Sequence, residues 1–470
     1  MEQTIFDSDN LPKIKKTLIN ILLFVSSIVA VVLILTRGNR ISVMGTLIVV
    51  TFCYSVLYLF LLQFRPEVLK VNRKTFFIML TILSFLIITR YVLNIQKNNI
   101  IYIVPFAVIP VVIRTFYDSR LALFILLITI MLAGFMVPEP YEFILMNFLS
   151  GMVAIFTLTN NFRKSRLFFT SLMVILSYWI FYFGMHMIKN SDLGSAVLFD
   201  CLLFACNGIL VLISFPLIFL FEQKFLLISD ATLLLLADPN QPLLRKLANE
   251  APGSYQHSLQ VANIAEEAAR VIGANMHLVR TGALYHDIGK VAAPGYYIEN
   301  VVEGGSPHDK LDPKDSAKVI INHVRQGVIL AKNYKIPVQV IDFIRTHHGT
   351  SVAYFFFKKY VDQNPDEKEN TKAFSYPGPK PFSKETAIVM MADAVEASSR
   401  SLEKYSEEGI SELVERIIYL QEQDGQYSDV PLTYKDISDI KAVFKKRLQN
   451  IYHARIALTL KGFEDGLEIP

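Results

Sequence analysis

The chain has 470 residues, of which 52% are hydrophobic and only 19% charged, and its formal net charge is +4. Soluble globular domains carry about 25% charged residues, so these values exclude a protein that lies wholly in water. The modest net charge argues against a nucleic-acid polymer as a partner. All three cysteines lie in apolar segments, at Cys53, Cys201 and Cys206. Their positions exclude a disulfide framework and a metal site with thiolate ligands.

The first half of the chain is predicted to cross a membrane. Residues 17–221 form an almost continuous apolar domain, preceded by an N-terminal segment, residues 1–16. A spanning helix needs about 20 apolar residues, and the first run is too long for a signal peptide. Eight runs qualify as spans, of which the proline-containing fourth is the weakest: 17–36, 41–63, 75–94, 100–116, 119–137, 141–160, 167–188 and 195–221.

Basic residues predict the orientation of these spans, because cytoplasmic loops carry an excess of Lys and Arg. With eight spans, thirteen fall on one side: Lys13, Lys15, Lys16, Arg65, Lys70, Arg73, Lys74, Arg114, Arg120, Arg163, Lys164, Arg166 and Lys224. The other side holds five: Arg37, Arg40, Arg90, Lys97 and Lys189. We therefore expect a multi-pass protein with both termini in the cytoplasm, whereas seven spans would break the alternation. Asp200 and Arg90, which lie in apolar runs, are candidates for a polar site within the membrane, although side chains that reach water at an interface are the favoured interpretation.

The second half, residues 222–470, has the charge density of a soluble domain. Residues 222–250 are predicted to be a mostly helical connector, in which Pro242 begins a new helix. From residue 251 onward apolar residues recur every three or four positions, as in Val261, Ile264, Ala265 and Ala268. Further helices are expected at 277–286, 313–333, 337–348, 383–400, 409–422 and 434–452, with an exposed loop at 361–375.

No convincing alternating strand pattern occurs, so the fold class is predicted to be all-α. The architecture is a polytopic helical membrane domain of about eight spans, followed by an all-helical domain at residues 251–470. The last helix is expected to begin with a capping box formed by Thr433 and Asp436.

Histidines and aspartates of the second half form the candidate site. Seven of the nine histidines fall between residues 257 and 348, in strings that include HDIGK (286–290) and HHGT (347–350), and an aspartate follows in MADAVEA (391–397). Imidazoles and carboxylates without thiolates suit iron, manganese, zinc or nickel. The candidate ligands are His257, His286, Asp287, His323, His347, His348 and Asp393, whereas His277, His308 and His453 are interpreted as ordinary core or surface residues.

Six or seven such ligands are too many for one metal ion, but they suit two ions that share a bridging carboxylate. Two neighbouring ions lower the pKa of a bridging water and stabilise both oxygens of an in-line displacement at phosphorus. Asp393 lies in the apolar run IVMMADAV, where a carboxylate is costly unless it is paired or bound to metal. The composition of the site therefore predicts a dinuclear metal phosphohydrolase.

The HD…HH…D pattern resembles the HD superfamily of metal-dependent phosphohydrolases. The longer strings YQHSLQVANIAEEAA, ALYHDIGKVAAPGYYIEN and YPGPKPFSKETAIVMMADAVEASSRS, together with FRPEVLKVNRK in the membrane half, resemble the seven-transmembrane-HD family of bacterial cyclic di-AMP phosphodiesterases. The similarity extends over nearly the whole chain from about residue 40. It implies an enzyme of the bacterial inner (plasma) membrane whose HD domain is cytoplasmic.

Carried over to this sequence, the resemblance implies that the seven candidate residues bind two divalent ions, iron or manganese, with Asp287 as the bridge. Lys290 would hold the scissile phosphate, so that Asp287 and Lys290 are the expected catalytic residues. The implied reaction is hydrolysis of cyclic di-AMP to pApA by a metal-bound hydroxide. The lipid bilayer is the other expected partner, and homodimer formation is left open.

Two departures from that family leave alternatives open. Its members carry a large extracytoplasmic domain after the first span. In this chain only TRGNR (36–40) connects the first two spans. The chain would then be either a natural short form of the family or an engineered deletion. No GYP triplet follows His347-His348, which disfavours the branch that hydrolyses cyclic di-GMP. The remaining alternatives are hydrolysis of another nucleotide, cyclic di-GMP or a guanosine polyphosphate, and a receptor that uses the HD domain only as a relay.

Overall fold

The computed structural model describes residues 13–36, 42–95, 100–158, 164–189, 195–301, 306–367, 371–402 and 405–464. Within these ranges the chain forms helices and no strand, with one antiparallel bridge between Val352 and Ser375, which confirms the predicted all-α fold class. The chain divides into two compact units, Met1–Ala231 and Thr232–Pro470. Most of the predicted N-terminal segment, the linker residues Arg37 and Arg40, and the basic residues Lys97 and Arg163 lie outside the described residues.

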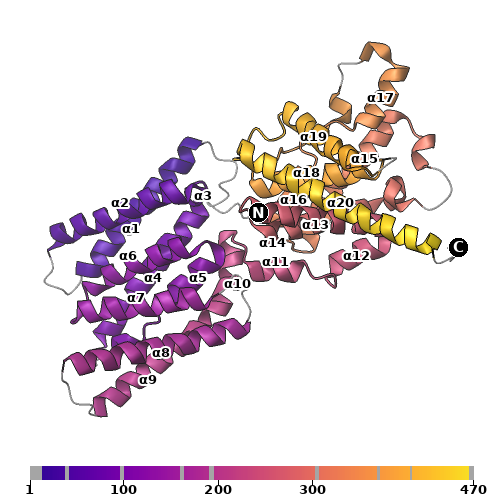
Figure 1. The fold of residues 1–470 in the computed structure, drawn as a ribbon. Coiled ribbons are helices and arrows are strands. Elements are labelled where there is room, and N and C mark those ends of the chain that lie inside the picture. The colour runs from indigo at the N-terminus through magenta and orange to yellow at the C-terminus, as the bar shows by residue number, and fades with distance from the viewer. Residues whose placement is uncertain are drawn as a thin grey trace. The chain divides into compact units, whose positions relative to one another are not determined.

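The first unit consists of helices that coincide with the predicted apolar runs (Figure 1). In chain order they are α1 (Lys13–Thr36), α2 (Val43–Phe64), α3 (Pro66–Leu69), α4 (Asn72–Asn94), η2 (Ile100–Ile103), α5 (Val108–Phe116), α6 (Ser119–Gly134), α7 (Pro140–Thr157), α8 (Lys164–Ile188), α9 (Ser195–Leu210), η3 (Val211–Ile213) and α10 (Ser214–Phe225).

Among the described residues, six helices are long and apolar enough to cross a membrane. The segments Ile100–Phe116 and Ser119–Gly134 are apolar but shorter, so the count of eight spans is not confirmed and stays a prediction. The first of them is divided at Pro105 into η2 and α5, because proline lacks the amide hydrogen that continues a helix. The protein is therefore a multi-pass membrane protein.

Asp200 is not the water-facing side chain that the sequence suggested. It lies on α9, is only 2% exposed and accepts a hydrogen bond from the Tyr182 hydroxyl of α8. On the same helix, the Asn207 amide donates to the carbonyls of Tyr102 and Val104, each over 2.8 Å. Hydrogen bonds inside the unit thus engage the Asp200 carboxylate and the Asn207 amide hydrogens.

The second unit contains the predicted helices of the soluble half (Figure 1). They are α11 (Asp230–Leu236), α12 (Pro242–Glu250), α13 (Pro252–Val271), α14 (Met276–Tyr285), α15 (Pro313–Asn333), α16 (Val338–Thr346), α17 (Tyr354–Gln363), α18 (Lys384–Ser399), α19 (Glu407–Gln423) and α20 (Tyr434–Glu464). Between α14 and α15 the chain makes four short 3-10 turns: η4 (Ile288–Ala292), η5 (Pro294–Tyr296), η6 (Ile298–Asn300) and η7 (Pro307–Lys310).

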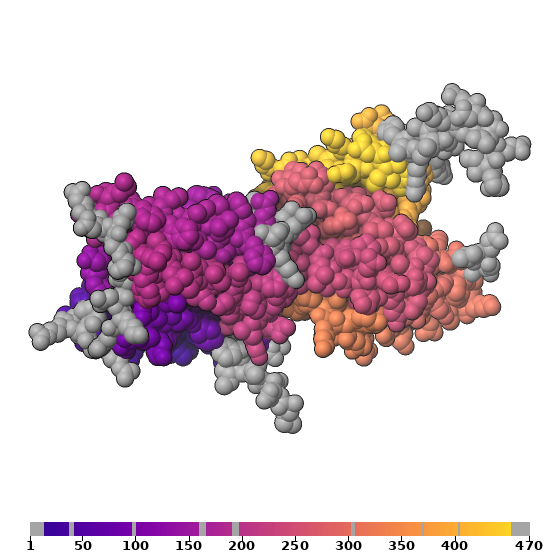
Figure 2. All heavy atoms as spheres, turned by 90° about the horizontal axis from the view of Figure 1, so that it is seen from below, coloured from indigo at the N-terminus to yellow at the C-terminus, as the bar shows by residue number. Residues whose placement is uncertain are grey.

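Helix α13 is the centre of this unit, since it packs against α14, α18 and α20. Its predicted apolar stripe is fully buried, as the sequence pattern required. In the space-filling view the rose-coloured first helices of the unit form one continuous surface, with the yellow α20 on one side of it (Figure 2). The predicted cap of α20 is present, because Thr433 N donates to Asp436 Oδ2 over 2.9 Å and Asp436 N donates to Thr433 Oγ1 over 3.1 Å.

The prediction of an exposed loop at residues 361–375 was partly wrong. Helix α17, which was not predicted, extends to Gln363, and the short turn η9 (Lys372–Phe374) follows. Phe374 is fully buried in a small cluster with Ala317 and Tyr360. A single aromatic side chain therefore anchors this polar segment against α15 and α17, and a residue-by-residue polarity pattern does not reveal such an anchor.

Candidate metal centre

Five helices of the second unit bring all seven predicted ligands together. His257 lies within α13, His286 and Asp287 follow the end of α14, and His323 lies within α15. His347 and His348 follow α16, and Asp393 lies within α18. Their ligand atoms form three overlapping groups, each within 4.8 Å: His323, His347 and His348; His257, His286 and Asp393; and His286, Asp287 and His347.

A glycine allows the HD pair to reach its neighbours on α15. A Cβ atom on Gly289 would lie 1.9 Å from the carbonyl oxygen of His323 and 2.6 Å from the amide nitrogen of Gly327. Real Cβ atoms do not make such contacts, so only glycine lets η4 lie directly against α15. This close approach places Asp287 beside His323, which is 36 residues later in the chain.

The two carboxylate oxygens of Asp287 face different histidines. Oδ2 lies 3.2 Å from His286 Nε2 and 3.7 Å from His257 Nε2. Oδ1 lies 3.4 Å from His323 Nε2 and 3.7 Å from His347 Nε2. A carboxylate that presents one oxygen to each of two imidazole pairs has the geometry of a bridging ligand.

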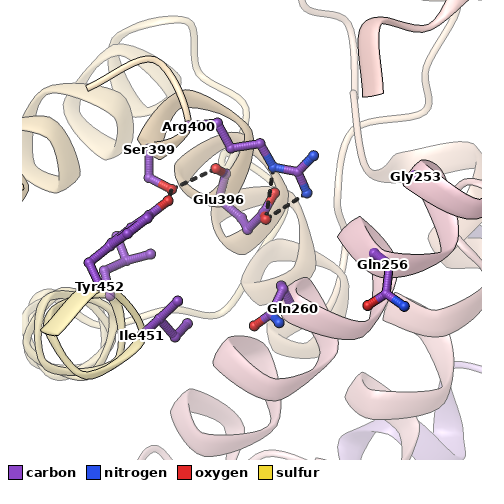
Figure 3. A pocket seen from close by; sticks show the side chains of 9 residues that line it. Gly253, Gln256, Gln260, Glu396, Ser399, Arg400, Ile451 and Tyr452 are labelled. Carbon is purple, nitrogen blue, oxygen red and sulfur yellow. Dashed lines mark hydrogen bonds and ion pairs between the residues drawn. The ribbon is translucent and has the colours of Figure 1, made fainter. Parts of the chain in front are cut away.

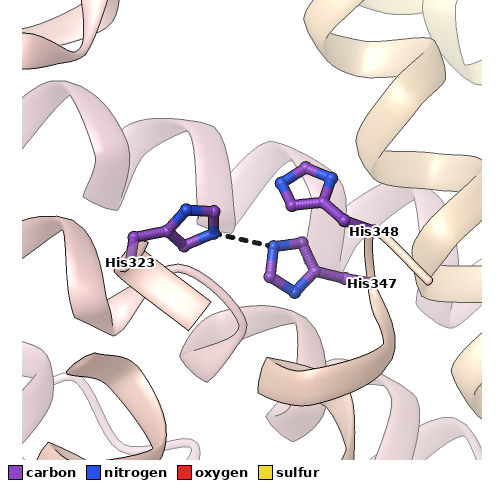
Figure 4. A group of neighbouring side chains, drawn as sticks. All are labelled: His323, His347 and His348. Carbon is purple, nitrogen blue, oxygen red and sulfur yellow. Dashed lines mark hydrogen bonds between the residues drawn. The ribbon is translucent and has the colours of Figure 1, made fainter. Parts of the chain in front are cut away.

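Asp393 is the second carboxylate of the centre, and its contacts divide the ligands into two groups. Its Oδ1 lies 2.9 Å from His257 Nε2 and 3.6 Å from His286 Nε2, while its Oδ2 lies 3.9 Å from His348 Nδ1. We call His257, His286 and Asp393 the first half of the centre, and His323, His347 and His348 the second half. The three imidazoles of the second half converge in Figure 4, with 3.1 Å between His323 Nε2 and His347 Nε2.

Backbone carbonyls fix the orientation of three histidine rings. The Nδ1 atoms of His286, His323 and His347 lie 2.6, 2.6 and 2.9 Å from the carbonyl oxygens of Ala283, Ile320 and Ile344. Because a carbonyl oxygen only accepts, each Nδ1 donates its hydrogen and each Nε2 presents a lone pair to the centre. This is the usual arrangement of metal-binding imidazoles.

Buried atoms of the centre fit a metal ion. His286 Nε2 and Asp287 Oδ1 are buried and make no hydrogen bond within the described part of the chain. Leaving such atoms unsatisfied is costly, and coordination to a cation would satisfy both. The donor set of imidazoles and carboxylates is also one that divalent transition metals accept.

The charge states of the site agree with this interpretation. Burial alone would raise the pKa of Asp287, but the charges of His286 and Lys290 hold it well below its usual range. Burial and the neighbouring imidazoles lower the pKa of His347, which keeps this ring in the neutral form that binds metals. Despite burial, the two carboxylates raise the pKa of His286 to about 10, so they attract positive charge to this point, as a proton or as a cation.

Lys290 lies at the edge of the centre and faces a cleft. Its Nζ lies 2.8 Å from Asp287 Oδ2 and 2.7 Å from Glu299 Oε1, and Glu299 also accepts a hydrogen bond from Ser254 Oγ over 2.8 Å. The cleft has a volume of about 740 Å³ and is lined by His257, Lys290, His348 and Asp393, among others. Both carboxylates beside the lysine, Asp287 and Glu299, hold its ammonium at the cleft wall.

Two functional neighbours were missed at the sequence level. Glu299 pairs with Lys290, and Glu396 lies 2.5 Å from Nδ1 of His257. Glu396 follows Asp393 by three residues, a spacing that places both on one face of α18 and could have indicated it. As predicted, His308 lies outside the centre, where it contacts Tyr296 and Phe356, while the side chain of His453 lies outside the described residues.

Comparison with known proteins identifies both halves of the chain. Residues 40–229 match the family described as 7TM receptor with intracellular HD hydrolase, and residues 254–398 match the HD domain. The chain is thus similar to this 7TM-HD family in its first half and to the HD domain in its second half. The HD match includes all seven side chains of the centre, and an HD domain implies binding of divalent metal ions.

Curated relatives extend the likeness over most of the chain. The cyclic-di-AMP phosphodiesterase PgpH of Bacillus subtilis is 32% identical over 90% of this chain, and that of Listeria monocytogenes is 34% identical over 84%. The chain spans 61% and 55% of the lengths of these two proteins. The crystal structure of the Listeria HD domain in complex with cyclic-di-AMP is 41% identical, covers 46% of this chain and 100% of its own, and has a TM-score of 0.44.

Proposed function

We propose that this 7TM-HD protein is a membrane-anchored phosphodiesterase that hydrolyses cyclic di-AMP to pApA with two divalent ions, iron or manganese. The observation that carries the proposal is the convergence of seven imidazole and carboxylate side chains, four of which place an imidazole nitrogen within 3.7 Å of an oxygen of Asp287. The curated relatives, which are named cyclic-di-AMP phosphodiesterases and match 84–90% of the chain, support the choice of substrate.

The protein's own side chains have separate parts in this reaction. Asp287 and Asp393 hold the ligand sphere together across both halves of the centre. When bound, two divalent ions lower the pKa of a water and stabilise the oxygens of an in-line displacement at phosphorus. Lys290 adds a fixed positive charge at the cleft wall, where it would hold the scissile phosphate and stabilise the negative charge that develops on its oxygens.

The cleft is suited to a ligand of nucleotide size. Its volume of about 740 Å³ lies within the range of about 300–1,000 Å³ typical of small-molecule sites. The centre lies in its wall, and apolar side chains such as Met390, Leu420 and Val352 line the rest together with polar groups. Such a wall offers apolar surface on which nucleotide bases can pack, next to charged groups that can bind phosphates.

The location in the cell follows from the same proposal. The excess of basic residues on one side of the spans supports a cytoplasmic position for both termini and for the HD domain. A cytoplasmic second messenger would then reach the cleft directly. Homodimer formation is compatible with this arrangement but is not needed to complete the centre.

The test is a nucleotide panel with the purified full-length protein in detergent and Mn²⁺. We expect cyclic di-AMP to be converted to pApA, while cyclic di-GMP and guanosine polyphosphates stay intact. Hydrolysis of another nucleotide in place of cyclic di-AMP would contradict the substrate. Absence of hydrolysis from a protein that binds two ions would favour the receptor alternative, in which the HD domain is a relay.

A further inference from the structure

We propose that Glu396 is a positioning residue for His257 and that it makes the two halves of the metal centre unequal. The inference rests on the proposed dinuclear centre, but it concerns a carboxylate outside the seven ligands. Glu396 lies on α18, one helical turn after Asp393, and is only 6% exposed. It therefore needs a reason to carry a charge in the interior.

Both ring nitrogens of His257 face carboxylates from successive turns of α18. Nε2 lies 2.9 Å from Asp393 Oδ1, and Nδ1 lies 2.5 Å from Glu396 Oε2. An ionised carboxylate only accepts hydrogen bonds, so Nδ1 donates to Glu396. With Nδ1 protonated in this way, Nε2 is the nitrogen that would present a lone pair to a bound cation beside Asp393. Glu396 thus fixes both the rotation and the tautomer of this ring.

Arg400 holds Glu396 in place from the next turn of α18. Its Nε and Nη2 atoms donate to Glu396 Oε1 over 3.0 and 2.7 Å, which leaves Oε2 for His257. Figure 3 shows the guanidinium group turned toward the carboxylate, beside a pocket of about 330 Å³ that Gln256 and Gln260 also line. A two-point contact with an arginine fixes the geometry and compensates the charge of the buried carboxylate.

Three of the other ring orientations rest on neutral partners. His286, His323 and His347 donate to backbone carbonyls, whereas His257 donates to a carboxylate. An anionic partner raises the basicity of the imidazole as a metal ligand more than a neutral carbonyl does. Among the described ring contacts of the centre, His257 is therefore the imidazole with the most strongly basic ligand nitrogen, and it belongs to the first half. We expect the first half to bind its metal ion more tightly than the second half.

The inference can be tested by metal binding without any measurement of turnover. The full-length protein is stripped of metal and titrated with Mn²⁺, with the free ion followed by its paramagnetic resonance signal. We expect two unequal binding steps. Glu396→Gln keeps an acceptor oxygen but removes the charge, so it should weaken the tighter step about 10–100-fold and leave the other unchanged.

A matched control and a double-mutant cycle identify the route of the effect. Glu385→Gln makes the same chemical change in the first turn of α18 and should leave both steps unchanged. In a His257→Ala background, adding Glu396→Gln should cause no further change in Mn²⁺ affinity, because the effect of Glu396 passes through the His257 ring. A further loss in that background would overturn the proposal.

The remaining outcomes also discriminate. An unchanged titration of Glu396→Gln, or an equal loss of both ions, would contradict a positioning role for Glu396. If the single variant does not fold, Glu396→Gln combined with Arg400→Gln removes both charges of the pair and provides the same titration. Failure of the unaltered protein to bind two ions would instead contradict the proposed centre itself.

Discussion

At the scale of single residues, the seven ligands of the centre are not equivalent, because each ligand atom contacts different partners. Asp287 is the clearest case, because its two oxygens face His286 on one side and His323 on the other. It is only 1% exposed and is held in the ionised form by the neighbouring positive charges. Asp393 also faces both halves, but its second oxygen lies 3.9 Å from a single imidazole, His348, whereas each oxygen of Asp287 faces two.

Asp287→Asn should therefore remove both ions and not one. The amide of asparagine offers one neutral oxygen and one hydrogen-bond donor, so it cannot bridge two cations. We expect metal affinity to fall at least about 100-fold and phosphodiesterase activity to disappear. Metal content and turnover are measured on the same preparation, with Asp315→Asn on the exposed first turn of α15 as control. Retention of one tightly bound ion would refute the bridge.

Lys290→Met should separate charge stabilisation from metal binding. The ammonium contacts Asp287 and Glu299 but belongs to neither half of the centre. Its loss should lower kcat about 10²–10³-fold, as for other groups that stabilise developing charge, while both ions are retained. The measurement is kcat with cyclic di-AMP beside metal content, and Lys314→Met on the surface is the control. Loss of metal in proportion to activity would make Lys290 a structural residue instead.

The sequence predicted the seven side chains of the centre but not the partners behind them. Adjacent polar residues such as those in HDIGK or HHGT are unusual between apolar positions unless they bind a metal ion or a partner, so their residue types alone indicate a site. Glutamate, by contrast, is common on helix surfaces. Glu396 differs from other glutamates only because α18 packs on α13, and this packing is a tertiary contact.

At the scale of secondary-structure elements, close backbone approach organises the centre. Periodicity and caps predicted α13, α15 and α20 well, because their buried stripes and terminal hydrogen bonds are local in sequence. Helix α17 was missed because the run YFFF at its start is apolar at every position and shows no period. In the structure Phe356, Phe357 and Tyr360 form its partly buried stripe, while Tyr354 and Phe355 are exposed. The contact between η4 and α15 depends on Gly289 and could not be seen before both elements were placed.

Gly289→Ala should test this contact. The added methyl group would overlap the backbone of His323, so η4 and α15 must move apart. We expect a destabilisation of about 1–3 kcal/mol, together with weaker metal binding because Asp287 and His323 separate. Thermal unfolding and metal titration measure the two effects. Gly295→Ala is the matched control, since a Cβ there meets nothing within 4 Å, and an equal effect of both variants would contradict the role of the close contact.

At the scale of the whole molecule, a membrane unit and an HD unit are joined in one chain. Composition predicts a boundary near residue 222, where the charge density changes. The compact units of the structure divide between residues 231 and 232. The number of spans could not be predicted as well. Length and hydropathy identify six of the eight predicted spans, while Ile100–Phe116 and Ser119–Gly134 are short for a 30 Å hydrocarbon core.

Orientation is the property of the whole chain that the proposed function needs most. An even number of spans and the bias of thirteen basic residues against five predict that the HD unit faces the cytoplasm. In spheroplasts, protease added outside should therefore leave the second unit intact, detected by an epitope tag after residue 470. After permeabilisation, the same protease should cut it, which serves as the control. Cleavage of the second unit in intact spheroplasts would place the centre outside the cell, away from a cytoplasmic messenger, and would contradict both the predicted orientation and the proposed substrate.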